Sequence, residues 1–147
     1  MAKFNFPMEK VFQVKKKLEK QKQLELGNAL QALGKSQELL LEIEGRLHEA
    51  NQRFQINLST GCVNSSEMKS AHERIRYYHQ AMTEQKQLIR QHKLKVEEAK
   101  EALKRALQDR KIFESLKEKA FETYIDNEKL EDAKRLDEIV SYKYRNS

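Results

Sequence analysis

The chain has 147 residues, of which 38% are hydrophobic and 35% are charged, and its formal net charge is +6. This composition is poor in core residues for a globule, and the single cysteine excludes an internal disulfide and suits a reducing cytoplasm. No stretch has the apolar run of a signal peptide or the roughly 18 apolar residues of a membrane span, so we expect neither.

The first predicted element is a helix over about residues 6–58. Asn5 and Pro7 are typical of a helix start, because an asparagine side chain caps free N–H groups and proline suits the first turn. Near the start of this helix, the sequence predicts a seam through Val11, Val14, Leu18 and Lys22. The steps from Leu18 to Lys22 and from Lys22 to Leu26 are both of four residues, and such a stutter would unwind a supercoil locally. The main seam positions, at steps of three and four, are Leu26, Ala29, Leu33, Ser36, Leu40, Ile43, Leu47, Ala50 and Phe54.

The next predicted element is a loop over about residues 59–66, where Ser, Thr, Gly and Asn residues cluster. Ser65 is expected to cap the following helix, with Glu67 in its first turn, and Cys62 is interpreted as a plain loop residue. Helices joined by such a short loop run antiparallel, and facing residues then have numbers that add to about 125. This register pairs Phe4 with about residue 121.

The last predicted element is a helix over about residues 67–143 with a heptad seam of about eight repeats. The seam is interrupted only by Gln85, His92, Arg110 and Lys117. We expect an all-α fold, a long two-helix antiparallel coiled-coil hairpin that forms one domain over residues 1–147. The apolar seam residues are Met68, Ala71, Ile75, Tyr78, Met82, Ile89, Val96, Ala99, Leu103, Ala106, Phe113, Ala120 and Tyr124.

The predicted register leaves the last 25 or so residues as a helical overhang without a partner helix. Leu130, Ala133, Val140 and Tyr144 continue an apolar stripe there, and a helix with an uncovered stripe is marginal by itself. We predict that the overhang frays in isolation and becomes ordered on a partner. Apolar residues off the seam, such as Leu39 and Tyr77, either flank the seam or mark a docking face.

Positive charge is concentrated in two blocks. Residues 1–23 carry 7 Lys and Arg against 2 acidic residues, and residues 85–121 carry 11 against 6. The antiparallel register brings parts of these blocks together, which predicts one basic end. Nucleic acid is a poor candidate ligand, because acidic residues interleave and the basic runs lack aromatic residues for stacking.

No catalytic or metal-binding pattern is present in the sequence. The four histidines, His48, His72, His79 and His92, form neither an HExxH motif nor a zinc pattern with cysteines, and there is no glycine-rich phosphate loop. We therefore expect no enzyme activity, no metal and no cofactor, and look for function in surfaces, ends and partners. A purely structural coiled coil and a holdase-like chaperone remain open alternatives.

Both ends of the chain resemble one known family. The opening FNFPMEKVFQVKK, with Phe4, Phe6 and Phe12, resembles the F-x-F start and Lys/Leu-rich helix of the flagellar FliJ family. Residues 111–140, KIFESLKEKAFETYIDNEKLEDAKRLDEIV, are similar to the family's end, where an aromatic and basic helix precedes a segment that closes on an Asp-Glu pair. Length, the two-helix plan and the central breaker also agree.

The resemblance implies a component of the flagellar type III protein export apparatus that acts in flagellum biogenesis and thus in motility and chemotaxis. Such proteins resemble the central stalk of rotary ATPases. Their implied partners are a FliI-like export ATPase hexamer, the cytoplasmic domain of an FlhA-like export gate, and export chaperones. The implied location is cytoplasmic and peripheral on the cell membrane at the flagellar base. The alternative is the equivalent stalk protein of a virulence type III injectisome.

The resemblance also suggests partner-binding residues, one set on the basic end for the ATPase ring and one set nearer the loop for the gate. Seam packing remains an alternative explanation for the gate set, except for Ala81. The ring candidates are Lys10, Lys15, Lys111, Lys117, Lys119, Phe121 and Ile125. The gate candidates are Leu47, Phe54, Tyr78 and Ala81.

Overall fold

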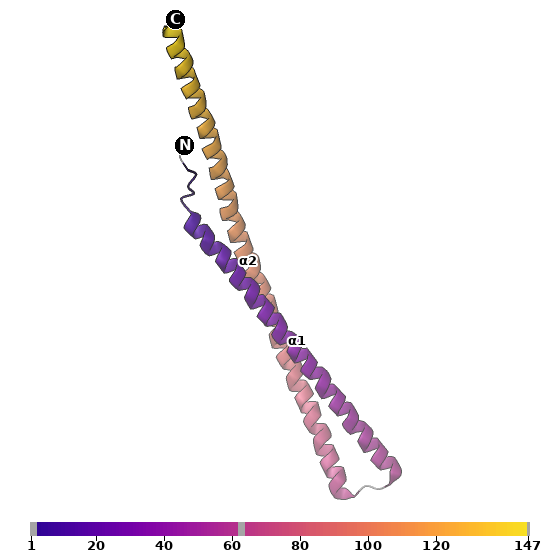
Figure 1. The fold of residues 1–147 in the computed structure, drawn as a ribbon. Coiled ribbons are helices and arrows are strands. Elements are labelled where there is room, and N and C mark those ends of the chain that lie inside the picture. Colours follow the sequence, from indigo (N-terminus) through magenta and orange to yellow (C-terminus); the bar gives the residue numbers. More distant parts are fainter. Residues whose placement is uncertain (1–2, 62–63, 147) are drawn as a thin grey trace. The chain divides into compact units, whose positions relative to one another are not determined.

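The computed structural model describes residues 3–61 and 64–146, which form two long helices (Figure 1). Helix α1 spans Glu9–Thr60 and helix α2 spans Ser65–Arg145. The helices pack against each other, and the described ranges contain no strand. The predicted all-α helical hairpin is therefore confirmed, while Cys62 lies outside the described residues.

The hairpin consists of two compact units, each built from one segment of α1 and one segment of α2. The hairpin unit comprises Gln23–Ala102 and contains the loop. The terminal unit comprises Met1–Lys22 and Leu103–Ser147. Each unit has its own set of buried side chains.

Helix α1 begins at Glu9, which is three residues later than predicted. The backbone N–H of Glu9 donates to the carbonyl oxygen of Phe6 at 3.1 Å, and the N–H of Phe12 donates to Met8 at 2.9 Å. Pro7 thus occupies the second position of a turn that precedes the helix, a position that suits its fixed φ. Asn5 lies before this turn rather than at the helix start.

Helix α2 is capped by Asn64, so the prediction that Ser65 is the cap is wrong. The Oδ1 atom of Asn64 accepts a hydrogen bond from the backbone N–H of Glu67 at 2.8 Å. Asn and Ser are about equally good caps. The side chain of a capping residue reaches the backbone N–H three positions later, and for Glu67 that residue is Asn64. Glu67 lies in the first turn, as predicted. Gly61 follows α1 with a φ of 71°, the left-handed conformation common just after helices.

In the hairpin unit, the predicted seam is the covered face of both helices. Every seam position of α1 from Leu26 to Phe54 and of α2 from Met68 to Ala99 is buried or half-buried. This includes Gln85 and His92, the polar interruptions of the apolar pattern. The most deeply buried side chains of the unit are Ser36, Leu47, Gln85, Ile89 and Val96.

In the terminal unit, the seam predicted through Val11 and Val14 is wrong. Val14 is 60% exposed, whereas Phe12 is 4% exposed. Leu18 and Lys22, the other predicted seam positions, are half-buried. The buried or half-buried residues of α1 in this unit are Glu9, Phe12, Lys15, Lys16, Leu18, Glu19 and Lys22. Phe12, Lys15, Glu19, Lys22 and Leu26 are spaced by alternating steps of three and four, so the covered face extends upstream without requiring the predicted second step of four.

Candidate functional site

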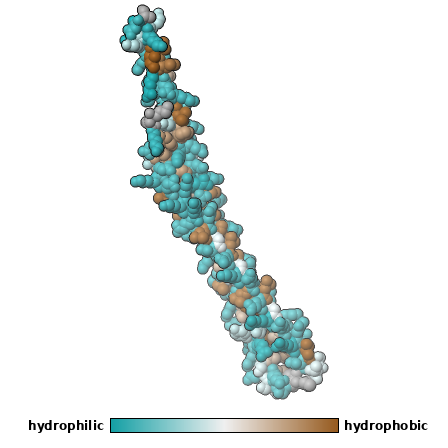
Figure 2. Space-filling model, viewed as in Figure 1, coloured by the Kyte–Doolittle hydropathy of each residue, from teal (hydrophilic) through white to brown (hydrophobic). Residues whose placement is uncertain are grey.

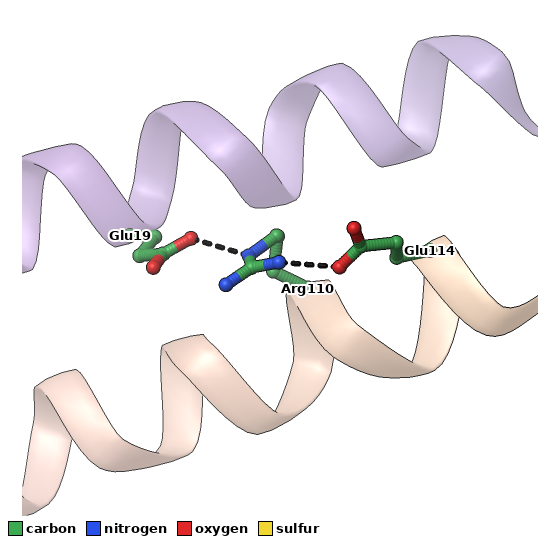
Figure 3. A network of polar contacts seen from close by, with 3 residues as sticks. All are labelled: Glu19, Arg110 and Glu114. Atoms are coloured by element: carbon green, nitrogen blue, oxygen red, sulfur yellow. Dashed lines mark hydrogen bonds and ion pairs between the residues drawn. The ribbon is translucent and has the colours of Figure 1, made fainter.

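An ion-pair network joins the two helices within the terminal unit. Arg110 of α2 points between the helices, where its Nε donates to Oε2 of Glu19 at 2.7 Å (Figure 3). Its Nη1 donates to Oε2 of Glu114, one turn further along α2. The hydrogen bond to Glu19 is the main reason why the pKa of Arg110 is raised above its ordinary value. Three charged side chains are thus linked at this point between the helices.

A second cross-helix ion pair lies near the start of α1. Lys117 Nζ is 2.9 Å from Glu9 Oε2, and Gln13 Nε2 donates to the other oxygen of Glu9 at 2.9 Å. Contact with Lys117, and then the bond from Gln13, lowers the pKa of Glu9. Lys117 also lies 5.4 Å from the ring centroid of Phe12, so this lysine covers the buried phenylalanine.

An aromatic cluster fixes the N-terminal segment on α2. The ring centroid of Phe4 lies 5.2 Å from that of Phe121 in an edge-on arrangement and 5.4 Å from that of Tyr124. The pairing of Phe4 with about residue 121 is therefore confirmed. Phe121 nevertheless remains 47% exposed, and Ile125 beside it is half-buried. Phe121 and Ile125 line one shallow hollow on α2.

The five ring-candidate lysines fall into two groups. Lys10, Lys111 and Lys119 are exposed. Lys15 and Lys117 are half-buried and form ion pairs within the unit, Lys15 with Asp109 at 3.7 Å and Lys117 with Glu9. The exposed group can meet a partner directly, whereas the paired group also holds the unit together.

The C-terminal end of α2 carries an apolar face that the described residues leave uncovered. We call residues 129–146 the overhang; all of them are exposed. In the terminal unit α2 continues past the N-terminal segment (Figure 1), and hydrophobic residues lie on the surface near its C-terminal end (Figure 2). At 3.6 residues per turn, one face of the overhang collects the apolar stripe. The stripe comprises Leu130, Ala133, Leu136, Val140 and Tyr144.

The gate candidates all lie in the hairpin unit, where three of them line hollows on the surface and one is buried in the seam. Tyr78 and Ala81 line the same hollow, which also includes the exposed Leu39 and Tyr77. Phe54 is half-buried and lies 5.1 Å from the ring of His72, in another hollow nearer the loop. Leu47 is buried in the seam. Seam packing accounts for Leu47, while Tyr78 and Ala81 are accessible from outside.

Pattern reasoning missed the role of Phe12 and of the charged seam residues. Phe12 is followed three and four positions later by Lys15 and Lys16 and not by an apolar residue, so periodicity alone favours Val11. A signal for Phe12 was nevertheless present in its side chain, since a phenylalanine buries more apolar area than a valine. The opposite charges of Glu19 and Arg110 at paired seam positions were the corresponding signal for the network.

Two further properties bear on the type of site. Within the described ranges, no three His, Cys, Asp or Glu side chains are grouped so as to hold a metal ion. Neither described helix contains a segment that is long and apolar enough to cross a membrane.

Comparison with known proteins identifies the family. The family model for the flagellar FliJ protein matches residues 4–147. No curated protein and no solved structure matches the chain significantly. Because the family match covers nearly the whole chain, the protein belongs to the flagellar FliJ family, and this membership indicates a component of flagellar type III protein export.

Proposed function

We propose that the protein links a FliI-like export ATPase hexamer to the cytoplasmic domain of an FlhA-like export gate at the cytoplasmic face of the cell membrane. It acts by binding, and it assists export chaperones through the same surfaces. The observation that carries the proposal is the exposed apolar stripe of the overhang, within a chain of the FliJ family.

The overhang is the surface proposed to enter the ATPase ring. Leu136 and Val140 are exposed by about three fifths, and no described residue covers their face of the helix. A contiguous apolar face of this kind is typical of a helix that docks on another protein. The exposed Lys10, Lys111 and Lys119 lie in the same unit and favour association with an acidic surface, mainly by speeding encounter.

The hollow at Tyr78 and Ala81 is the surface proposed to meet the gate. Its lining combines these two residues with Leu39 and Tyr77, which are more exposed. The ring of Tyr77 lies 5.5 Å from that of Tyr78, so the two tyrosines present a continuous aromatic surface. Aromatic anchors of this type supply much of the binding energy in protein interfaces.

Substitutions in the overhang test the ATPase contact without disturbing the packed part of the hairpin. The double variant Leu136→Glu with Val140→Glu places two charges on the stripe. The matched control Tyr142→Glu with Asn146→Glu places two charges, likewise four residues apart, on the opposite face of the overhang. Co-purification with the FliI-like ATPase should fall at least about tenfold for the stripe variant only. Equal binding of both variants and the unchanged protein would exclude the overhang as the ring contact.

Tyr78→Ala tests the gate contact, with Tyr142→Ala as the control in the other unit. We expect Tyr78→Ala to reduce binding of the FlhA-like cytoplasmic domain while the melting temperature stays within a few degrees of that of the unchanged protein. A large fall in melting temperature would instead assign Tyr78 to the core. Unchanged gate binding would exclude Tyr78 from the contact.

A further inference from the structure

Two arginines from facing helices line a common groove in the hairpin unit. The groove consists of two adjoining hollows that share Ala50 and Arg53 of α1 and Arg74 of α2. Phe54 and Ala71 line the hollow nearer the loop, and Tyr78 lines the other. Both arginines therefore share this groove with small and aromatic side chains, which we call its floor.

Neither arginine has a partner among the residues that the structure describes. Arg46, which lines the second hollow as well, donates from Nη2 to Glu42 at 2.9 Å and is thereby engaged. Arg53 and Arg74 form no ion pair or hydrogen bond with a described residue. Glu49 and Glu67 also line the groove, but neither lies within ion-pair distance of these two arginines. Two arginines from facing helices thus line one groove without an ion-pair partner among the described residues.

The residues that line the groove favour a carboxylate with an apolar group next to it. Guanidinium groups bind carboxylates through paired, charge-assisted hydrogen bonds. The groove also lies beside Ser66 and Ser70 in the first turns of α2, where the positive end of the helix dipole favours negative charge. The apolar floor next to the arginines suits a hydrophobic side chain adjacent to the acidic group.

We propose that Arg53 and Arg74 form a carboxylate-binding site that receives a Glu or Asp side chain of a partner protein, with a neighbouring apolar residue on the groove floor. A protein segment fits better than a nucleic acid or a lipid surface. Glu49 and Glu67, which also line the groove, repel any anion, but the repulsion grows with the charge of the ligand, so a single carboxylate is disfavoured less than a polyanion. This inference rests on the proposed function, because the groove shares Tyr78 with the proposed gate surface.

A peptide titration tests the site independently of the gate. The probe is a capped hexapeptide of alternating Leu and Glu, added to the full chain while the Nε–Hε signals of Arg53 and Arg74 are followed by NMR. We expect both signals to shift at about millimolar peptide, and the Leu and Gln counterpart to cause no shift. No shift with the Glu peptide, or tighter binding of inorganic phosphate than of the peptide, would overturn the assignment to a protein carboxylate.

The partner is tested with the purified cytoplasmic domain of the FlhA-like gate protein. Arg53→Gln with Arg74→Gln removes two charges from the groove, and Arg76→Gln with Arg90→Gln removes two exposed charges from α2 outside it. We expect about tenfold weaker gate binding for the groove variant only, with a reduced dependence on salt. If the groove variant binds as the unchanged protein does, the arginine site is wrong and the linking function stands. If the unchanged protein does not bind the gate, the gate contact is wrong, and the peptide titration decides the site by itself.

Discussion

Gln85 of α2 donates a hydrogen bond from Nε2 to the backbone carbonyl oxygen of Ser36 in α1, at 2.9 Å. Both residues are buried in the seam of the hairpin unit, with 7% and 8% of their surfaces exposed. A polar residue that finds its partner at one seam position fixes the register of a coiled coil at a cost in stability. The pair therefore specifies how the two helices align.

Replacing Gln85 by Leu should increase the stability of the hairpin but relax its register. A buried leucine adds about 1 to 2 kcal/mol of apolar burial, while the carbonyl of Ser36 keeps its place in α1. Urea unfolding should therefore shift to higher concentrations, and light scattering should detect dimers beside monomers. Gln87→Leu, at an exposed position, is the control and should change neither. A loss of stability for Gln85→Leu would mean that the hydrogen bond outweighs the apolar gain.

Phe12→Ala should destabilise the protein far more than Val14→Ala. Removal of a phenylalanine side chain that is 4% exposed costs about 3 kcal/mol or more, through lost burial and the cavity left behind. Val14 is 60% exposed, so its truncation should cost less than about 0.5 kcal/mol. Chemical unfolding of the two variants measures the difference. Equal losses in the free energy of unfolding would instead support the predicted seam through Val14.

Much of the fold follows from spacing, because apolar residues recur at steps of three and four wherever the seam is apolar. Met68 to Ala99 of α2 shows this directly, and the loop breakers place the turn. The upstream segment of α1 was not predictable in the same way. Its seam residues Lys15, Glu19 and Lys22 are covered only because their charged ends reach partners or solvent, which depends on the facing helix.

The candidate sites were predictable only in part, since periodicity finds the seam but not what lies beside it. Tyr78 fits the seam pattern, yet its access to a hollow with Tyr77 depends on the distance between the helices. The groove arginines show the same limit. Arg53 and Arg74 are charged residues off the seam, and only the antiparallel register places them at one groove.

The Glu19 and Arg110 pair should show strong coupling in a double-mutant cycle. Arg110→Met alone leaves the carboxylate of Glu19 without its cross-helix partner, and its side chain is only 13% exposed, so the melting temperature should fall. Glu19→Met combined with Arg110→Met should recover most of the loss, because an apolar pair replaces an ion pair with little penalty. Additive losses in the double variant would show that the pair contributes through separate contacts.

Acid should weaken the terminal unit through Glu9. The folded-state pKa of Glu9 is lowered from its ordinary value of 4.5, chiefly by Lys117. A depressed carboxylate pKa contributes stability that is complete above about 4.5 and is lost as the pH falls through the folded-state value. Urea unfolding between about pH 6 and pH 3 should therefore show a smaller acid loss in Glu9→Gln than in the unchanged protein. The same pH dependence in both would exclude Glu9 as a contributor.

The overhang should exchange its amide hydrogens rapidly in the free protein and slowly in complex with the FliI-like ATPase. Its helix has no described partner, and a segment of this length is marginally stable alone. The surface pairs of Arg135 with Glu131 and Asp132, at 3.9 and 3.8 Å, add little because both partners are exposed. Hydrogen exchange should thus protect residues 68–99 strongly and residues 129–145 only after the ATPase is added. Strong protection of residues 129–145 in the free monomer would show that the overhang is a stable helix by itself, and that binding is not needed to order it.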